Sequence, residues 1–174
     1  MEFPPLPSWD GLHPLIIHFP IALLLVAPLL VVLGALAGKR GKGMLMAALI
    51  LMVLGTAFSY LAVETGEAAA ELADRTPQMA PVLAHHQKLA ERTRLMFTVL
   101  TLLFAAITLG PALLKRDMKR PLALAFYACF LALYAVGAIS LANTAHNGGR
   151  LVHEFGVRAL MPVAPPAASE EPHA

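Results

Sequence analysis

Four long runs of the chain contain no Asp, Glu, Lys or Arg, and short charged segments separate them. Each run is about as long as the roughly 20 residues that a helix needs to cross a bilayer. None of the runs has the polar face that a helix on a soluble domain carries. The pattern predicts an all-α integral membrane protein, a four-helix bundle with transmembrane helices over residues 15–38, 43–63, 95–114 and 121–145.

The polar segments next to these runs predict where helices continue and where they stop. Segments 64–74 and 81–94 are rich in Ala, Leu, Glu, Gln and Lys, which favour helix, so the membrane helices should extend beyond the lipid. Asn147, Gly148 and Gly149 should end the fourth helix, because paired glycines favour a helix C-terminus. Residues 162–174 are rich in Pro, Ala and Glu and predict a disordered tail after one membrane domain, 1–161.

Composition and charge support insertion in a membrane and predict its direction. The chain is 58% hydrophobic and 14% charged, whereas soluble domains are roughly 45–50% apolar. Seven basic residues fall in loops 39–43 and 115–120, so these loops should face the cytoplasm, and both termini and the 64–94 loop should lie outside. The first run is preceded by acidic Glu2 and Asp10 and followed by basic residues, which is unlike a cleaved signal peptide. The basic residues are interrupted by apolar runs, which argues against nucleic-acid binding.

The histidines gather toward the predicted outer side. Six of the seven lie at or beyond the outer ends of the apolar runs: His13, His18, His85, His86, His146 and His153. Counting about 1.5 Å per residue from each cytoplasmic end places His13, Glu67, His86 and His146 within about one helical turn of the same height. His18 and Glu64 fall one to two turns lower on the same count.

Imidazole and carboxylate groups at one level are ligands suited to a transition metal or a haem iron. The candidate haem ligands are His13, His18, His86 and His146, and the candidate metal ligands are His13, Glu67, His86 and His146. A flat macrocycle would also need a slot of small residues, for which Gly66, Ala68, Ala69, Ala70, Ala142 and Ala145 are candidates. Neither an HExxH nor a CxxCH motif is present.

Each of these residues also has a purely structural interpretation. His13 precedes Pro14 and is equally suited to capping the first helix. Glu64 and Glu67 share a helix face and could pair with Arg92 or Arg94. In this interpretation the histidines satisfy one another and nearby backbone groups, and the protein is a structural or assembly subunit of a membrane complex with no cofactor.

Three motifs resemble those of a bacterial membrane-protein family called domain of unknown function 2231. They are Leu12-His13-Pro14-Leu15-Ile16-Ile17-His18-Phe19-Pro20-Ile21-Ala22-Leu23-Leu24, Thr65-Gly66-Glu67-Ala68-Ala69 with the later His86, and His146-Asn147-Gly148-Gly149-Arg150-Leu151-Val152 leading to Gly156-Val157. The resemblance implies a four-helix membrane bundle in the bacterial inner membrane. It marks as family-type positions His13, His18, Gly66, Glu67, His86, His146, Gly148 and Gly149. This chain has His153 where relatives often have tyrosine, and Phe155 where histidine is common, so His153 is not carried over as a ligand.

Relatives in this family are sometimes joined to redox modules such as cytochromes. Together with the histidines, this favours a subunit that binds haem b or a transition metal and passes electrons to a redox partner such as a cytochrome. A permease is disfavoured, because no Asp, Glu, Lys or Arg lies at mid-membrane depth. No nucleophile and base pair points to an enzyme.

Overall fold

The computed structural model describes residues 7–73, 75–116 and 118–157, and this part of the chain contains helices and no strand. The predicted tail, 162–174, lies outside the described residues. The elements in chain order are η1 (Asp10–Leu12), α1 (His13–Ile16), α2 (His18–Ala37), η2 (Gly38–Gly41), α3 (Lys42–Glu71), α4 (Met79–Leu113) and α5 (Arg120–His153). The predicted all-α class is confirmed.

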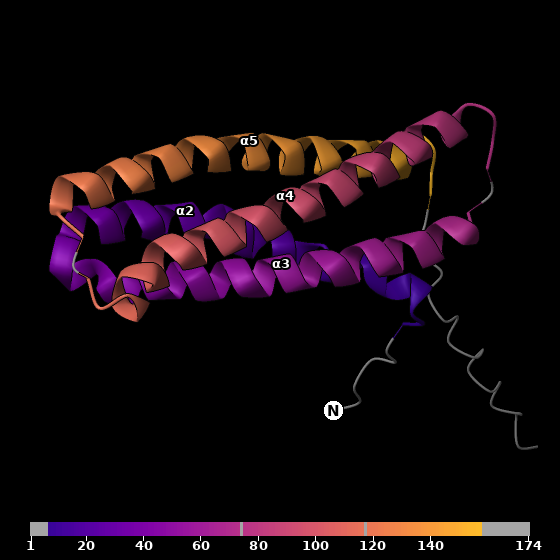
Figure 1. The fold of residues 1–174 in the computed structure, drawn as a ribbon. Helices are drawn as coiled ribbons and strands as arrows, with labels where there is room; N and C mark the ends of the chain where they lie inside the picture. The colour runs from indigo at the N-terminus through magenta and orange to yellow at the C-terminus, as the bar shows by residue number, and fades with distance from the viewer. Residues whose placement is uncertain (1–6, 74, 117, 158–174) are drawn as a thin grey trace, which may run out of the picture.

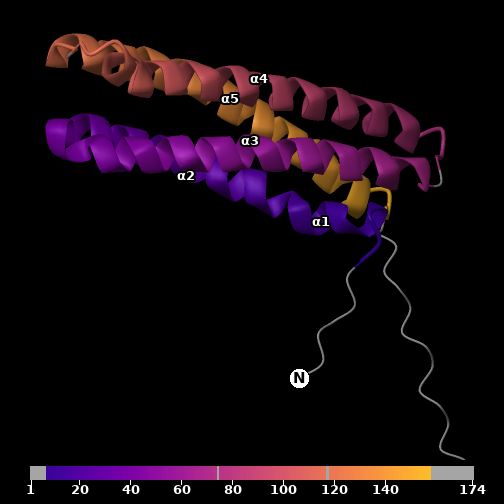
Figure 2. The ribbon, with the colours of Figure 1, turned by 60° about the horizontal axis from the view of Figure 1, so that its bottom comes forward.

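The long helices α2 to α5 lie side by side as two hairpins (Figure 1). The chain reverses between α2 and α3 at η2, where Gly38 adopts a positive φ of 59° that side-chain-bearing residues rarely take. Helix α2 packs mainly on α3, and α4 packs mainly on α5 (Figure 2). We call the end formed by α1, the α3–α4 connection and the last turns of α5 the histidine end. The opposite end, with η2 and the α4–α5 connection, is the basic end.

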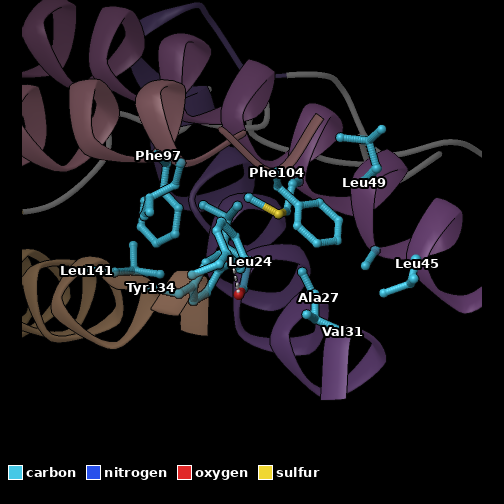
Figure 3. Close-up of a cluster of buried hydrophobic side chains, with 13 residues drawn as sticks. Leu24, Ala27, Val31, Leu45, Leu49, Phe97, Phe104, Tyr134 and Leu141 are labelled. Carbon is cyan, nitrogen blue, oxygen red and sulfur yellow. Dashed lines mark hydrogen bonds between the residues drawn. The ribbon is translucent and has the colours of Figure 1, made fainter. Parts of the chain in front are cut away.

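A cluster of apolar side chains from α2, α3, α4 and α5 fills the centre of the bundle (Figure 3). The hydroxyl of Tyr134 on α5 donates a hydrogen bond of 2.6 Å to the carbonyl oxygen of Leu24 on α2. The ring of Phe97 on α4 meets the Tyr134 ring edge-on, with 5.4 Å between centroids. Thr56 and Thr101 join α3 to α4 through hydroxyl oxygens 2.8 Å apart. Such bonds contribute on average about 0.6 kcal/mol each in membrane proteins, where packing and hydrogen bonds hold helices together.

Large apolar side chains cover much of the outside of the bundle. Large hydrophobic side chains exposed by more than half include Leu29, Leu36, Leu102 and Ile139. A soluble monomer rarely exposes so much contiguous apolar surface. Three of the described helical stretches are long and apolar enough to cross a membrane: Asp10–Glu71, which folds back on itself at η2, Met79–Leu113 and Arg120–His153.

The helical extensions of α3 and α4 agree with the sequence pattern, whereas the end of α5 differs from the predicted one. Helix α3 continues to Glu71 and α4 begins at Met79, so the predicted segment 81–94 is helical and the predicted segment 64–74 is helical as far as residue 71. The prediction that Gly148 and Gly149 end the last helix is wrong, because α5 runs through both to His153. The glycine that follows the helix end is Gly156, which has a φ of 67°.

Candidate functional site

A cavity of about 120 Å³ lies at the histidine end, between α1, α3, α4 and α5. Most of its lining is small or apolar, and its polar lining residues are His13, Glu67, His86 and Gln87. The small lining residues come from α3 and the connection after it, from α4 and from α5: Ala62, Gly66, Ala69, Ala70, Ala73, Ala90 and Gly148. Larger apolar residues, including the buried Met79, Leu83 and Leu151, form a second core cluster beside it. The cavity is therefore an apolar space that two imidazoles reach.

His13 is fixed by the helix that packs against it. Its Nδ1 lies 2.9 Å from the carbonyl oxygen of Ala62 on α3. A carbonyl can only accept, so Nδ1 carries the proton and, in the neutral ring, Nε2 is left with a free lone pair. Nδ1 also lies 3.3 Å from the hydroxyl oxygen of Thr65, which itself donates to the carbonyl of Leu61. The ring lies against Gly66, where an added Cβ would be 2.9 Å from Cε1 of His13.

His86 is held in the same way by the other hairpin. Its Nδ1 lies 3.0 Å from the carbonyl oxygen of Thr144 on α5, so this Nδ1 is also the protonated nitrogen. The Thr144 hydroxyl is anchored in turn, 2.9 Å from that of the buried Thr93. The ring lies against Gly148, where an added Cβ would be 3.0 Å from Cε1 of His86. Hydrogen bonds from Nδ1 to backbone carbonyls are the usual way in which proteins orient a histidine that ligates a metal through Nε2.

The surroundings of both rings favour the neutral imidazole. Burial lowers the pKa of His13, the hydrogen bond to Ala62 partly offsets this, and the proximity of His86 lowers the pKa further. Burial also lowers the pKa of His86, with partial compensation by the hydrogen bond to Thr144. Both shifts move the pKa below the ordinary value of 6.5, so at pH 7 each Nε2 is free to donate its lone pair.

The two hairpins repeat one plan. In each, the carbonyl that accepts from the histidine precedes, by four residues, the glycine under the ring: Ala62 and Gly66 in one, Thr144 and Gly148 in the other. A fully buried side chain follows each histidine by eleven residues: Leu24 after His13 and Phe97 after His86. Leu24 packs against Gly55, and Phe97 packs against Gly137. Gly55 lies eleven residues before Gly66, and Gly137 lies eleven residues before Gly148. Because eleven residues make about three helical turns, the two glycines of each pair lie on the same face of their helix. Each hairpin thus presents one equivalent histidine to the shared cavity.

The structure brings together some of the predicted site residues and not others. His13, Glu67 and His86 line the one cavity, whereas His18 and His146 are exposed and do not line it. Of the predicted slot, Gly66, Ala69 and Ala70 line the cavity, and Ala68, Ala142 and Ala145 do not. The anchoring groups, the carbonyls of Ala62 and Thr144 and the hydroxyl of Thr65, were not among the predicted residues. The repeated pair of glycines eleven residues apart is the signal in the sequence that points to them.

The donors in this cavity do not form a complete site for a bare ion. Over residues 7–73, 75–116 and 118–157, no group of three or more His, Cys, Asp or Glu side chains is placed to hold a metal. Structural zinc sites have four protein ligands, and catalytic ones have three. Two histidines alone suit an iron whose other ligands come from a porphyrin.

An all-helical bundle with an apolar exterior and long apolar helices defines an integral membrane protein. The sequence profile of the family described as predicted membrane protein, domain of unknown function 2231, matches residues 10–160. The chain belongs to this family, and the resemblance seen in its motifs is confirmed. No curated protein and no solved structure matches the chain.

Proposed function

We propose that this protein is a membrane electron-transfer subunit that binds one haem b at the histidine end, where Nε2 of His13 and Nε2 of His86 would hold the iron. The bound haem would supply one-electron redox chemistry. The observation that carries the proposal is the matched anchoring of the two rings. Each hairpin fixes one imidazole through Nδ1, which leaves the lone pair of the neutral ring on Nε2, and both histidines line the same apolar cavity.

The residues that line the cavity have the chemistry that a haem needs, but the cavity would have to widen to hold a porphyrin. A volume of about 120 Å³ is a few times the roughly 30 Å³ that one water occupies in the liquid, and a porphyrin is larger. The residues that would have to move include Met79, whose unbranched thioether side chain adapts easily to a new shape. The small residues of α3 already allow a flat group to approach the backbone. Loading is therefore expected to repack the second core cluster and to leave the central cluster in place.

The visible spectrum of the purified protein tests this function. Protein produced with an ample supply of haem, and purified in detergent, should contain about one haem per chain by pyridine haemochrome assay. Its spectrum should be that of a low-spin iron with two imidazole ligands, with a sharp Soret band and resolved α and β bands on reduction. If no haem is bound after production or after titration with haemin, the proposal fails. The histidines are then better explained as clamps that join helices through the carbonyls of Ala62 and Thr144.

The orientation in the membrane has its own prediction. We propose four crossings with both termini outside, because seven basic residues lie in the two connections at the basic end or begin the helices that follow them. Reporter fusions after Lys42 and Met118 should score as cytoplasmic, and a fusion after Ala164 should score as external. This orientation would place the haem near the outer surface, within reach of an external redox partner such as a cytochrome. An external score at Met118 would contradict the arrangement.

A further inference from the structure

A second hollow lies at the basic end, far from the histidines. It has a volume of about 420 Å³ and is lined by one face of α4, by Phe126 of α5 and by the connection between these helices. On α4 the lining residues Leu103, Ile107, Gly110 and Leu114 recur every three or four positions, so the hollow follows the helix as a groove. Leu114 and Phe126 are exposed, as are large apolar residues beside them, so the groove opens toward the surface that faces lipid.

The groove combines an apolar floor with a basic rim. Arg116 lines its mouth. Further basic side chains at the same end are exposed: Lys39, Arg40, Lys42, Lys115, Lys119 and Arg120. The one acidic residue in these connections, Asp117, lies outside the described residues. The described basic side chains are therefore concentrated at the end of the bundle where the groove lies.

A proline among the lining residues leaves one backbone carbonyl of α4 without its usual helical partner. Pro111 lies within α4 and has no N–H, so the carbonyl of Ile107 loses its usual helical hydrogen bond. Both residues line the groove. An unpaired carbonyl in lipid is costly unless a partner reaches it.

We propose that this groove is a binding site for a phospholipid with a net negative headgroup, of the phosphatidylglycerol type. One acyl chain lies along the face of α4, the phosphate contacts the guanidinium of Arg116, and the surrounding basic residues favour the anionic headgroup. Basic pockets between transmembrane helices on the cytoplasmic side bind anionic lipids on the same principle. A guanidinium suits a phosphate because its planar donors can pair with two oxygens at once. This site is independent of the haem proposal.

Native mass spectrometry of the delipidated full-length protein tests the site. With equimolar phosphatidylglycerol and phosphatidylcholine, the wild-type protein should retain more phosphatidylglycerol. Arg116→Gln should lower that retention about fivefold, the size expected for one basic side chain beside an anionic headgroup. Arg40→Gln is the matched control, since it removes the same charge at the same end from a residue that does not line the groove.

A second variant tests the apolar part of the groove. An added Cβ at Gly110 would meet no atom within 4 Å, so Gly110→Leu should fill the groove without disturbing the bundle. It should remove most retained lipid of either kind while the helical circular dichroism stays unchanged. Equal retention of the two lipids by the wild-type protein would overturn the proposal. So would an equal loss in Arg40→Gln and Arg116→Gln, because it would show a diffuse charge effect.

Discussion

Replacing His86 with alanine is expected to abolish haem binding while the helices stay folded and inserted. The substitution removes one of the two proposed iron ligands and the hydrogen bond from Nδ1 to the carbonyl of Thr144. Changes that only disturb the support of a ligand cost about 10–100-fold in affinity, so loss of the ligand itself should cost more than roughly 100-fold. His13→Ala should have the same effect, because His13 holds the equivalent position in the other hairpin. The measurement is the haem content and Soret band of each purified variant.

The neighbouring histidine provides the matched control. His85 precedes His86 on α4 but is exposed and does not line the cavity, so His85→Ala should keep the wild-type spectrum and haem content. His146→Ala should also keep them, although sequence counting placed His146 at the same height as His86. If His85→Ala lost haem as fully as His86→Ala, or if both His13→Ala and His86→Ala kept it, the assignment of His13 and His86 as the residues that would hold the iron would be wrong.

The helices could be predicted from the sequence because a bilayer penalises charge so strongly. Runs without Asp, Glu, Lys or Arg located α2 to α5, and the helix formers in 64–74 indicated that the second of these helices extends beyond its apolar run, which α3 does as far as Glu71. The residue at which α5 ends could not be predicted from composition. Glycines at 148 and 149 have the composition of a helix end, but helix packing keeps Gly148 inside α5, where its missing side chain makes room for the His86 ring. Tertiary contact decided the role of this glycine.

The sequence predicts how far along each helix the site residues lie, but not toward which side of the helix they point. Counting residues gives the position along a helix, and it placed His13, Glu67 and His86 at the level of the cavity that they line. It does not give the rotation of each helix about its axis. His146 and Gly148 are two residues apart and so point about 200° apart around α5, and it is Gly148 that lines the cavity. The anchoring carbonyls leave no mark of their own on residue type, so only the repeated pairs of glycines eleven residues apart point to them.

Gly148 and Gly149 on α5 allow two effects of an added side chain to be separated: the effect on the His86 ring and the effect on the stability of the helix. Alanine in place of a glycine inside a helix is expected to stabilise it by about 1 kcal/mol. At Gly149 an added Cβ meets nothing within 4 Å, so Gly149→Ala should raise thermal stability and leave haem binding unchanged. At Gly148 the same Cβ would lie 3.0 Å from Cε1 of His86, closer than ordinary van der Waals contact, so the ring must shift.

Gly148→Ala is therefore expected to weaken haem binding about 10–100-fold, the usual effect of disturbing the support of a ligand, while the bundle remains as stable as in the wild-type protein. Displacement of the ring should change the stability of the bundle little, because only a side chain has to move. It should lower the affinity for haem, because the direction of Nε2 changes and the hydrogen bond to Thr144 is strained. Gly66→Ala should act likewise on His13, where the added Cβ would be 2.9 Å from the ring. Haemin titration and thermal unfolding of Gly148→Ala and Gly149→Ala in one detergent measure both quantities, and equal haem affinity in these two variants would show that the contact between Gly148 and His86 has no part in cofactor binding.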